Sequence, residues 1–499
     1  VGSQKRIMMN VKNFPALIGL AVCVFTAGCT VGPKYQRATA PVPAKWDVSE
    51  PWRESAPKDG LAKGEWWSVF HDDELSAFEK QALDANQTIK VSVAHLEQAR
   101  ASASLQIATQ FPTLSTAPGV ERQRLSGNRP ANSNFPVKSP VSQTNNVLPF
   151  AVGYEVDLFG QRRRSIEAAQ ASYQASAADL ENVRLVITAE LAGDYFTLRQ
   201  LDTELGILNR TVEALQKGLQ LVDSRHKGGV ASGLDVAQEE TLLNTTRTQA
   251  ILLQQQRKQV EDAIAVLLGK PAPDFHLPPR ELNAEPPALD AGLPSDLLER
   301  RPDIAEAERQ MAVANAQIGI ARAAYFPSLN LFGNGGWQAA DVAKLLNVQS
   351  TFWAVGANVA QEIFTGGSRR AQTQFAKAGY DASVADYRDA VLNAFREVQD
   401  DVTGLTVLNE ASHSQQQAVD AAQRTLNIST ERYTGGLVNY LDVVTAQQNL
   451  LNNEQQLAVI RGQRLVTSVL LIKALGGGWD AASLSAVQVK TKLKDVVAP

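Results

Sequence analysis

Two stretches of the chain share one unusual pattern. RHKGGVASGLDVA runs from Arg225 to Ala237, and RYTGGLVNYLDVV runs from Arg432 to Val444. Both contain Arg, two variable residues, Gly-Gly, an apolar residue, three variable residues and Leu-Asp-Val, and they lie 207 residues apart (432 − 225). Glycine readily adopts the left-handed conformation that ends a helix. Each stretch therefore predicts a sharp reversal between two helices.

Other short motifs recur at nearly the same distance. Phe111-Pro112 returns as Phe326-Pro327, EVDLF (155–159) returns as AQEIF (360–364), and Leu268-Gly269 returns as Leu475-Gly476, with offsets of 215, 205 and 207 residues. The near-constant offset indicates the tandem duplication of a unit of about 200 residues, which is far longer than the repeats of solenoid proteins.

Each copy contains the same predicted elements. A helix over 74–110 or 295–324 is stopped by Phe-Pro, and two segments with alternating apolar and small or polar residues follow. The alternation is clear where Trp353, Val355, Ala357 and Val359 are interleaved with smaller residues, and where Tyr154, Val156 and Leu158 are interleaved with carboxylates. This pattern favours strands of an outer-membrane barrel. Strands of a β-sandwich are the alternative.

Long proline-free runs follow the strands. The first extends from Gln161 to Lys227, and its counterpart extends from Arg369 to Thr434. A helix of that length measures about 100 Å. After each Gly-Gly turn a second run returns, to Leu268 in copy one and over 441–475 in copy two. Four strands cannot close a membrane barrel, which needs at least about eight, so several chains must combine. Two, three or four chains would satisfy this requirement.

The composition excludes several classes of protein. Charged residues make up 20% of the 499 residues and the net charge is −4, so no basic surface for nucleic acid is expected. Cysteine occurs only at Cys23 and Cys29, and no two of the five histidines lie three or four residues apart. We expect no metal site, no cofactor other than a covalent lipid on Cys29, and no enzymatic activity. A coiled-coil periplasmic lipoprotein is the rival class, but it would lack the alternating strands.

The N-terminus has the pattern of a secretion signal. Lys5, Arg6 and Lys12 precede an apolar run that ends in FTAGC at Cys29. Small residues before a cysteine are typical of a bacterial lipoprotein, so we expect 1–28 to be a signal peptide and Cys29 to carry lipid. An ordinary cleavage site with an incidental cysteine is the alternative. Thr30 indicates the outer membrane. The expected domains are a strap over 29–73, repeats over 74–285 and 286–480, and a tail over 481–499.

Three features together resemble one family. They are VGPKY after Cys29, the phrase PSDLLERRPDIAEAERQMAVANAQIGIARAAYFPSL (294–329) and the doubled Gly-Gly turns. They are similar to the outer-membrane efflux lipoproteins, the NodT and OprM branch of the TolC superfamily. The resemblance implies a mixed α and β, TolC-like fold, with four transmembrane β-strands and long periplasmic α-helices per chain that close as a homotrimeric β-barrel and α-barrel.

The resemblance also implies a function and partners. The trimer would be lipid-anchored in the bacterial outer membrane and extend into the periplasm, in contact with outer-membrane lipid. It would be the exit duct of a tripartite pump, with a periplasmic adaptor (membrane fusion) protein and an inner-membrane transporter of the RND type. The expected cargo is small toxic compounds such as drugs. An exit duct for heavy-metal ions or for a type I secreted protein is the alternative, although Met311 is the only methionine after Cys29.

The predicted functional residues lie at the two turns. Gly228, Gly229, Gly435 and Gly436 are expected to form the hairpin turns, and Ser232 and Asn439 to cap the next helices. Asp235 and Asp442 follow three residues later, as in a capping box. Copy two is bulkier around its turn, which predicts that its hairpin leans inward and narrows a pore. By resemblance, Leu441 would be the constriction, Asp442 an acidic ring, and Tyr433 the tie to Asp235 on the outer hairpin. Val438 and Thr445 depart from the family's gate pattern.

Charged residues outside the turns have simpler interpretations. The arginines at 162–164 and 369–370 lie where strand passes to helix, so we expect them to anchor the chain at the membrane rim. Asp400 and Asp401 lie in the middle of a predicted long helix, and we interpret them as part of a solvated face or of the lumen lining.

Overall fold

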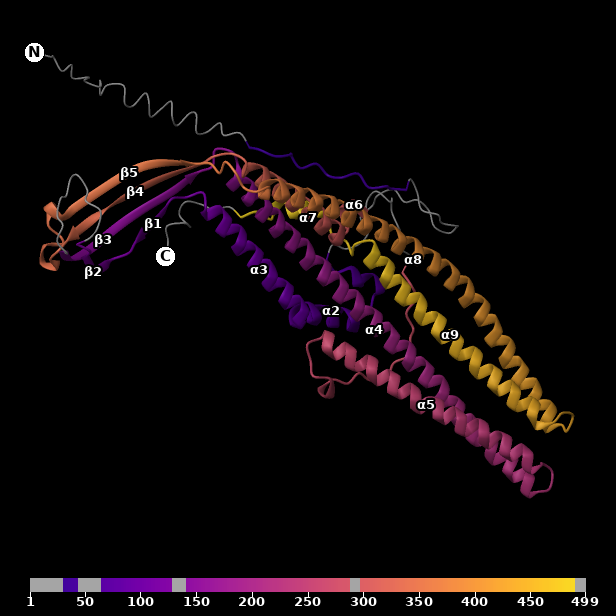
Figure 1. Ribbon diagram of the computed structural model, residues 1–499. Helices are drawn as coiled ribbons and strands as arrows, with labels where there is room; N and C mark the ends of the chain where they lie inside the picture. The colour runs from indigo at the N-terminus through magenta and orange to yellow at the C-terminus, as the bar shows by residue number, and fades with distance from the viewer. Residues whose placement is uncertain (1–29, 44–63, 128–140, 288–296, 490–499) are drawn as a thin grey trace, which may run out of the picture.

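The computed structural model describes residues 30–43, 64–127, 141–287 and 297–489. The molecule is elongated, with a β-sheet at one end and two long helical hairpins that reach toward the other end (Figure 1). The predicted signal peptide and Cys29 lie outside the described residues. None of the described helices combines the length and the apolar character needed to cross a bilayer.

The elements follow one another in the same order in both halves of the chain. The first half contains η2 (Trp66–Phe70), α2 (Asp73–Ala85), α3 (Gln87–Ala108), β1 (Thr113–Thr116), β2 (Gly119–Leu125), β3 (Val141–Val156), α4 (Gln161–Lys227), α5 (Gly233–Leu267) and η3 (Ala272–Asp274). The second half contains α6 (Leu297–Arg300), α7 (Pro302–Ala323), β4 (Ser328–Ala339), η5 (Val342–Lys344), η6 (Val348–Ser350), β5 (Thr351–Ala360), α8 (Ser368–Thr434), α9 (Tyr440–Ala474) and η7 (Ala481–Ala486).

The helix lengths confirm the tandem duplication. Helices α4 and α8 each contain 67 residues, and α5 and α9 each contain 35. The first residues of α4 and α8 are 207 positions apart (368 − 161), and those of α5 and α9 are also 207 apart (440 − 233). The bounds predicted for the long helices are therefore confirmed to within about one residue.

The sheet joins the two copies edge to edge. Its order is β1-β3-β4-β5, all antiparallel, and β2 also pairs with β3. Strands β1 and β2 lie along the same edge of β3 and are separated by Ala117 and Pro118, so they are one strand position with a break. Proline has no N–H to donate to a ladder, which accounts for the break. Strand β3 begins at Val141, which pairs with Leu125 at the end of β2.

One face of the sheet carries three large and exposed apolar side chains of β5. Trp353, Val355 and Val359 on β5 are 79%, 74% and 65% exposed. Trp353 pairs with Gly335 of β4, and Val355 pairs with Gly333, so small residues flank the large ones across the ladder. An exposed face of this composition suits a lipid environment better than water.

The prediction of one helix over 74–110 was wrong. Two helices, α2 and α3, meet at Asn86, whose backbone is extended (φ −61°, ψ 131°). The Asn86 side chain accepts hydrogen bonds from the N–H groups of Thr88 and Ile89, and its amide donates to the Leu267 carbonyl oxygen across 3.0 Å. An asparagine side chain that competes for backbone groups in this way ends one helix and caps the next.

Helix α4 is the central element of the helical layer. Ala168, Ala171, Ala175 and Ala178 form a buried stripe at helical spacing where α7 packs against it. On its next turns Tyr195, Leu191 and Leu198 contribute to the cores shared with α2, α5 and α9. The partner helix α8 lies at the edge and leaves large apolar residues uncovered, such as Phe375 at 82% exposure.

Candidate functional site: the hairpin tips

The two Gly-Gly turns lie at the end of the molecule away from the sheet (Figure 1). Gly229 and Gly436 have left-handed φ angles of 74° and 73°. The Val230 N–H donates to the Arg225 carbonyl oxygen across 2.9 Å, as in a Schellman motif, and the same bond follows Gly436 in copy two. The first glycine of each pair, Gly228 or Gly435, has φ near −80° (−81° and −78°). The left-handed step therefore belongs to the second glycine alone.

The two tips differ in how the returning helix is capped. Ser232 accepts hydrogen bonds from Leu234 and Asp235 N–H groups, and the Asp235 carboxylate accepts one from the Ser232 N–H across 3.1 Å. This is the complete capping box that the sequence predicted. In copy two, Asn439 accepts from the Asp442 N–H across 3.3 Å. No return bond to the Asp442 carboxylate occurs among the described residues.

The tips contact each other through a buried cluster, which we call the tip cluster: Val222, Tyr433, Tyr440 and Val443. The rings of Tyr433 and Tyr440 are 4.9 Å apart between centroids and tilted by 59°. Both tyrosines are buried, at 7% and 3% exposure. The sequence predicted that the bulk of copy two makes its hairpin lean inward and narrow a pore. The aromatic rings fill the contact between the hairpins, where they bury apolar area against α4.

Tyr433 makes a different contact from the expected one. The Arg225 guanidinium lies over its ring, 4.9 Å from the centroid. The Tyr433 hydroxyl oxygen is buried and has no hydrogen-bond partner within the described chain. Burial raises the pKa of Tyr433, and Asp235 contributes in the same direction against Arg225. Asp235 therefore influences Tyr433 through space, while its carboxylate is bound to the Ser232 N–H.

Leu441 and Asp442 project on the other side of their tip. Leu441 is 49% exposed and Asp442 is also exposed, whereas the neighbouring Tyr440 and Val443 are buried. Their copy-one counterpart Leu234 is 66% exposed. Copy two thus presents an apolar side chain and a carboxylate side by side to solvent, at the N-terminus of a helix whose dipole favours the anion.

Three residues of this site were missed in the sequence: Gly218, Arg225 and Glu239. Glu239 is fully buried (0% exposed) in the second turn of α5. It occupies an apolar stripe that continues through Leu242, Leu243 and Thr246, which are also buried. A carboxylate inside a stripe of helical spacing was the signal that could have identified it.

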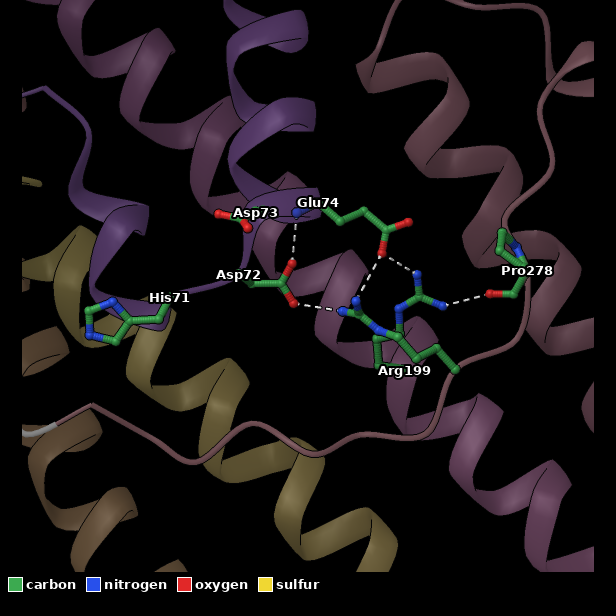
Figure 2. A pocket seen from close by; sticks show the side chains of 7 residues that line it. His71, Asp72, Asp73, Glu74, Arg199 and Pro278 are labelled. Atoms are coloured by element: carbon green, nitrogen blue, oxygen red, sulfur yellow. Dashed lines mark hydrogen bonds and ion pairs between the residues drawn. The ribbon is translucent and has the colours of Figure 1, made fainter.

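A second charged cluster lies midway along α4, where α2 and the segment after α5 pack against it. Arg199 binds Glu74 across 2.7 Å and Asp202 across 2.9 Å, and Arg280 binds Asp72 across 2.6 Å. Figure 2 shows the carboxylates of Asp72 and Glu74 directed at guanidinium groups, with His71 and Asp73 outside these pairs. Each buried charge drawn here has a partner, so we interpret the cluster as a structural clamp.

The junction between sheet and helices carries the predicted arginine anchors. Arg162 binds Glu155 across 2.7 Å, and Arg163 binds Asp157 across 3.2 Å, so both arginines pair with carboxylates at the end of β3. The Val31 N–H donates to the Phe159 carbonyl oxygen across 3.1 Å at the same junction. The residues directly after Cys29 therefore pack where the sheet gives way to α4.

A duplicated chain with a four-position sheet at one end and paired long helical hairpins at the other belongs to the TolC-like class of outer-membrane channels. The family described as "Outer membrane efflux protein" matches residues 79–270 and 293–477. The chain is 33% identical to "Probable efflux pump outer membrane protein TtgC" of Pseudomonas putida over 93% of this chain and 96% of that protein. It is 32% identical to "Outer membrane protein OprJ" of Pseudomonas aeruginosa over 92% and 95% of the two chains.

Solved structures agree with this assignment. The outer-membrane channel OprN superposes with a TM-score of 0.82 at 28% identity and covers 90% of this chain and 100% of its own. The chain belongs to the outer membrane efflux protein family. This assignment confirms the predicted family and the mixed α and β, TolC-like fold class. It also confirms the predicted role as an outer-membrane efflux channel without enzymatic activity.

Proposed function

We propose that three copies of this chain form the exit duct of a tripartite efflux pump, and that the α8–α9 tips are its periplasmic gate. The observation that carries the gate is the pairing of Leu441 and Asp442 on the exposed side of the copy-two tip, while the other side packs on copy one. Around a threefold axis, this pair would form an apolar ring beside a ring of carboxylates.

The edges of the molecule support the oligomer. The sheet ends in β5 on one side and in β1 and β2 on the other. Large apolar residues are also exposed on α8 and α5, among them Phe375, Val407 and Ile251. Open strand edges are not tolerated in lipid, so further copies must cover them. Three copies would provide twelve strand positions, within the range of closed membrane barrels.

The partners and the cargo are part of the same proposal. A periplasmic adaptor and an RND-type transporter would complete the pump, because the relatives named TtgC are described as outer membrane proteins of efflux pumps. Relatives named for toluene and antibiotic efflux support small toxic compounds as the cargo. Met311 is the only methionine after Cys29, and this scarcity favours such compounds over copper or silver ions.

The anchor is a lipid on Cys29 in this proposal. Thr30 and Val31 pack at the strand-to-helix junction, where the Gly160 backbone approaches Thr30 closely. A lipid on the preceding residue would then lie level with the membrane surface, beside the exposed apolar face of the sheet.

The oligomer is tested by native mass spectrometry of the detergent-solubilised protein. We expect a trimer. A monomer that retains the full strand content by circular dichroism would contradict the proposed duct. Export is tested by complementing a strain that lacks its own duct and measuring survival with toluene. Restored survival would support the exit duct, and unrestored survival would contradict it for this class of compound.

A further inference from the structure

Glu239 is a carboxyl group buried between the two hairpins without a conventional partner. It is 0% exposed, and neither carboxyl oxygen makes a hydrogen bond of ordinary geometry with the described residues. Native proteins pair nearly all of their buried polar atoms, since an unpaired one loses its hydration without compensation. A neighbouring copy could not provide a partner, because the Glu239 carboxyl is already buried within one chain.

The carboxyl group fits into a notch that a glycine creates. A Cβ atom added to Gly218 of α4 would lie 2.3 Å from Glu239 Oε1, which is closer than real atoms approach. The position of this added Cβ atom is 3.5 Å from the hydroxyl oxygen of Tyr440. The carboxyl of α5 and the hydroxyl of α9 therefore meet at a gap in the side chains of α4. The notch lies at the contact between the hairpins of copy one and copy two.

We propose that Glu239, seated in the notch at Gly218 and facing Tyr440, is a proton-dependent latch that holds the α8–α9 tip against the α4–α5 tip. The proposal rests on the proposed function, in which the α8–α9 tip is the periplasmic gate, and it adds that this tip moves when it separates from the α4–α5 tip. While the carboxyl is protonated, it is neutral and can remain in the dry notch beside the tyrosine hydroxyl. Once it is ionised, the charge is better accommodated in water, which reaches it only when the tips separate.

The charged and titratable groups that the structure describes near the notch do not form an ion pair with Glu239, so the latch depends on Glu239 and Tyr440. Tyr433 faces the site from α8, and Asp235 faces it from α5. Arg225 of α4 stacks over the Tyr433 ring and makes no ion pair with Glu239 within the described chain. An arginine paired with Glu239 would have kept the carboxyl ionised at all relevant pH values, and the latch would then not titrate.

The direction of the pH effect follows from the burial. Burial raises the pKa of Glu239 to about 7, and the Tyr440 hydroxyl opposes part of this rise. In separated tips the carboxyl regains water, and its pKa returns toward the ordinary value of about 4.3. The contact between the two tips is therefore fully favoured below the pKa of Glu239 in separated tips, and it is weakened as the pH rises through about 7. Between pH 5.5 and pH 8.5 the ratio of separated to closed tips should rise by on the order of tenfold or more per protomer.

The test measures tip separation directly in the full-length trimer. Spin labels are placed on the exposed tip residues Val230 and Leu437 after replacement by cysteine, with Cys23 and Cys29 replaced by serine. Distances are then measured by electron paramagnetic resonance at pH 5.5 and pH 8.5. We expect the separated population to grow at pH 8.5 in the otherwise unchanged protein, and Glu239→Gln, which stays neutral, to abolish this response.

Two glycine variants provide a matched pair. Gly218→Ala should displace the carboxyl from its notch and separate the tips at both pH values. Gly193→Ala introduces the same change in the same helix, where an added Cβ meets nothing within 4 Å, and should leave the tips as they are. A Glu239→Gln variant with an undiminished pH response, or a Gly218→Ala variant that matches Gly193→Ala, would overturn the latch.

A conductance measurement separates this proposal from the proposed gate. If the tips separate with pH while the single-channel conductance in planar bilayers stays constant, the latch is supported and the gate assignment to α8–α9 fails. If Leu441→Ala raises the conductance while the distance between the tips is the same at both pH values, the gate is supported and the latch fails.

Discussion

The Asp442 N–H donates to the Asn439 side chain across 3.3 Å, and the Asp442 carboxylate makes no return bond to the Asn439 backbone within the described chain. The equivalent pair of copy one, Ser232 and Asp235, makes both bonds. The two copies thus share the turn, but the Asp442 carboxylate lacks the backbone hydrogen bond that the Asp235 carboxylate makes. Because Asp442 is exposed at a helix N-terminus, its charge faces solvent there, and in the proposed gate it would face the ions that pass the tip.

This difference predicts unequal effects on the two helix starts. Asp235→Asn should fray the first turn of α5 by about 0.5–1 kcal/mol, because it weakens half of a capping box. Asp442→Asn should leave the first turn of α9 nearly as protected as before. Amide hydrogen exchange over both turns measures this. Equal loss of protection at the two helix starts would contradict this difference, because it would show that the Asp442 carboxylate also stabilises the first turn of α9.

The ion cluster on α4 predicts a large stability effect at Asp202, which is buried and binds both Arg199 and Arg257, at 2.9 and 2.6 Å. Asp202→Ala leaves two buried guanidinium groups short of a partner and should destabilise the fold by about 3–5 kcal/mol. Glu281→Ala is the control, because its pair with Arg210 is more than half exposed on both sides and is worth about 1 kcal/mol or less. Thermal unfolding of both variants is the measurement, and similar losses would contradict the clamp.

The pair Asp400 and Asp401 predicts a pH dependence of stability. Burial, together with Glu397 and Asp400, raises the pKa of Asp401 to about 7. The folded state is therefore favoured while Asp401 is protonated, and this contribution is lost as the pH rises through about 7. Asp401→Asn should unfold at a higher temperature than the unchanged protein at pH 8 and at a similar one at pH 5. The exposed Asp420 of the same helix, whose carboxylate accepts a hydrogen bond from Gln416 across 2.9 Å, provides the control variant Asp420→Asn, which should not show this difference between the two pH values.

The pattern TAGC, which ends at Cys29, predicts a lipid on this residue. Cys29→Ser should abolish labelling by radioactive palmitate, while the oligomer should persist because the sheet also holds the protein in the membrane. Mass spectrometry of the mature native protein provides the direct measurement. An unmodified Cys29 at the N-terminus would contradict the anchor.

Most of the fold could be predicted from periodicity. The proline-free runs fixed α4 and α8 nearly to the residue, because a helix with no breaker and a Gly-Gly terminator has few alternatives. The break between α2 and α3 was missed, since Asn86 stops the helix through bonds to its own neighbours and to Leu267. The split at Pro118 was missed because only the second strand segment of copy one shows a clear alternation.

The candidate site was predicted only where the sequence repeats. Comparison of the copies identified the turns and the caps, and the family resemblance pointed to Leu441 and Asp442. It could not place the aromatic rings, because the same bulk can face a pore or a neighbouring helix. Glu239 has no counterpart in the repeated motif, and its burial depends on Gly218, which lies on another helix 21 residues away (239 − 218).

The most direct test of the gate is the single-channel conductance of the purified trimer in planar bilayers. Leu441→Ala removes the apolar group that would narrow the resting pore, since a hydrophobic constriction impedes water and ions. We expect this variant to raise the resting conductance several-fold over the unchanged protein, whereas Leu234→Ala, the same change on the copy-one tip, should have a clearly smaller effect. Equal increases from Leu441→Ala and Leu234→Ala, or no increase from Leu441→Ala, would contradict the assignment of the gate to the α8–α9 tip.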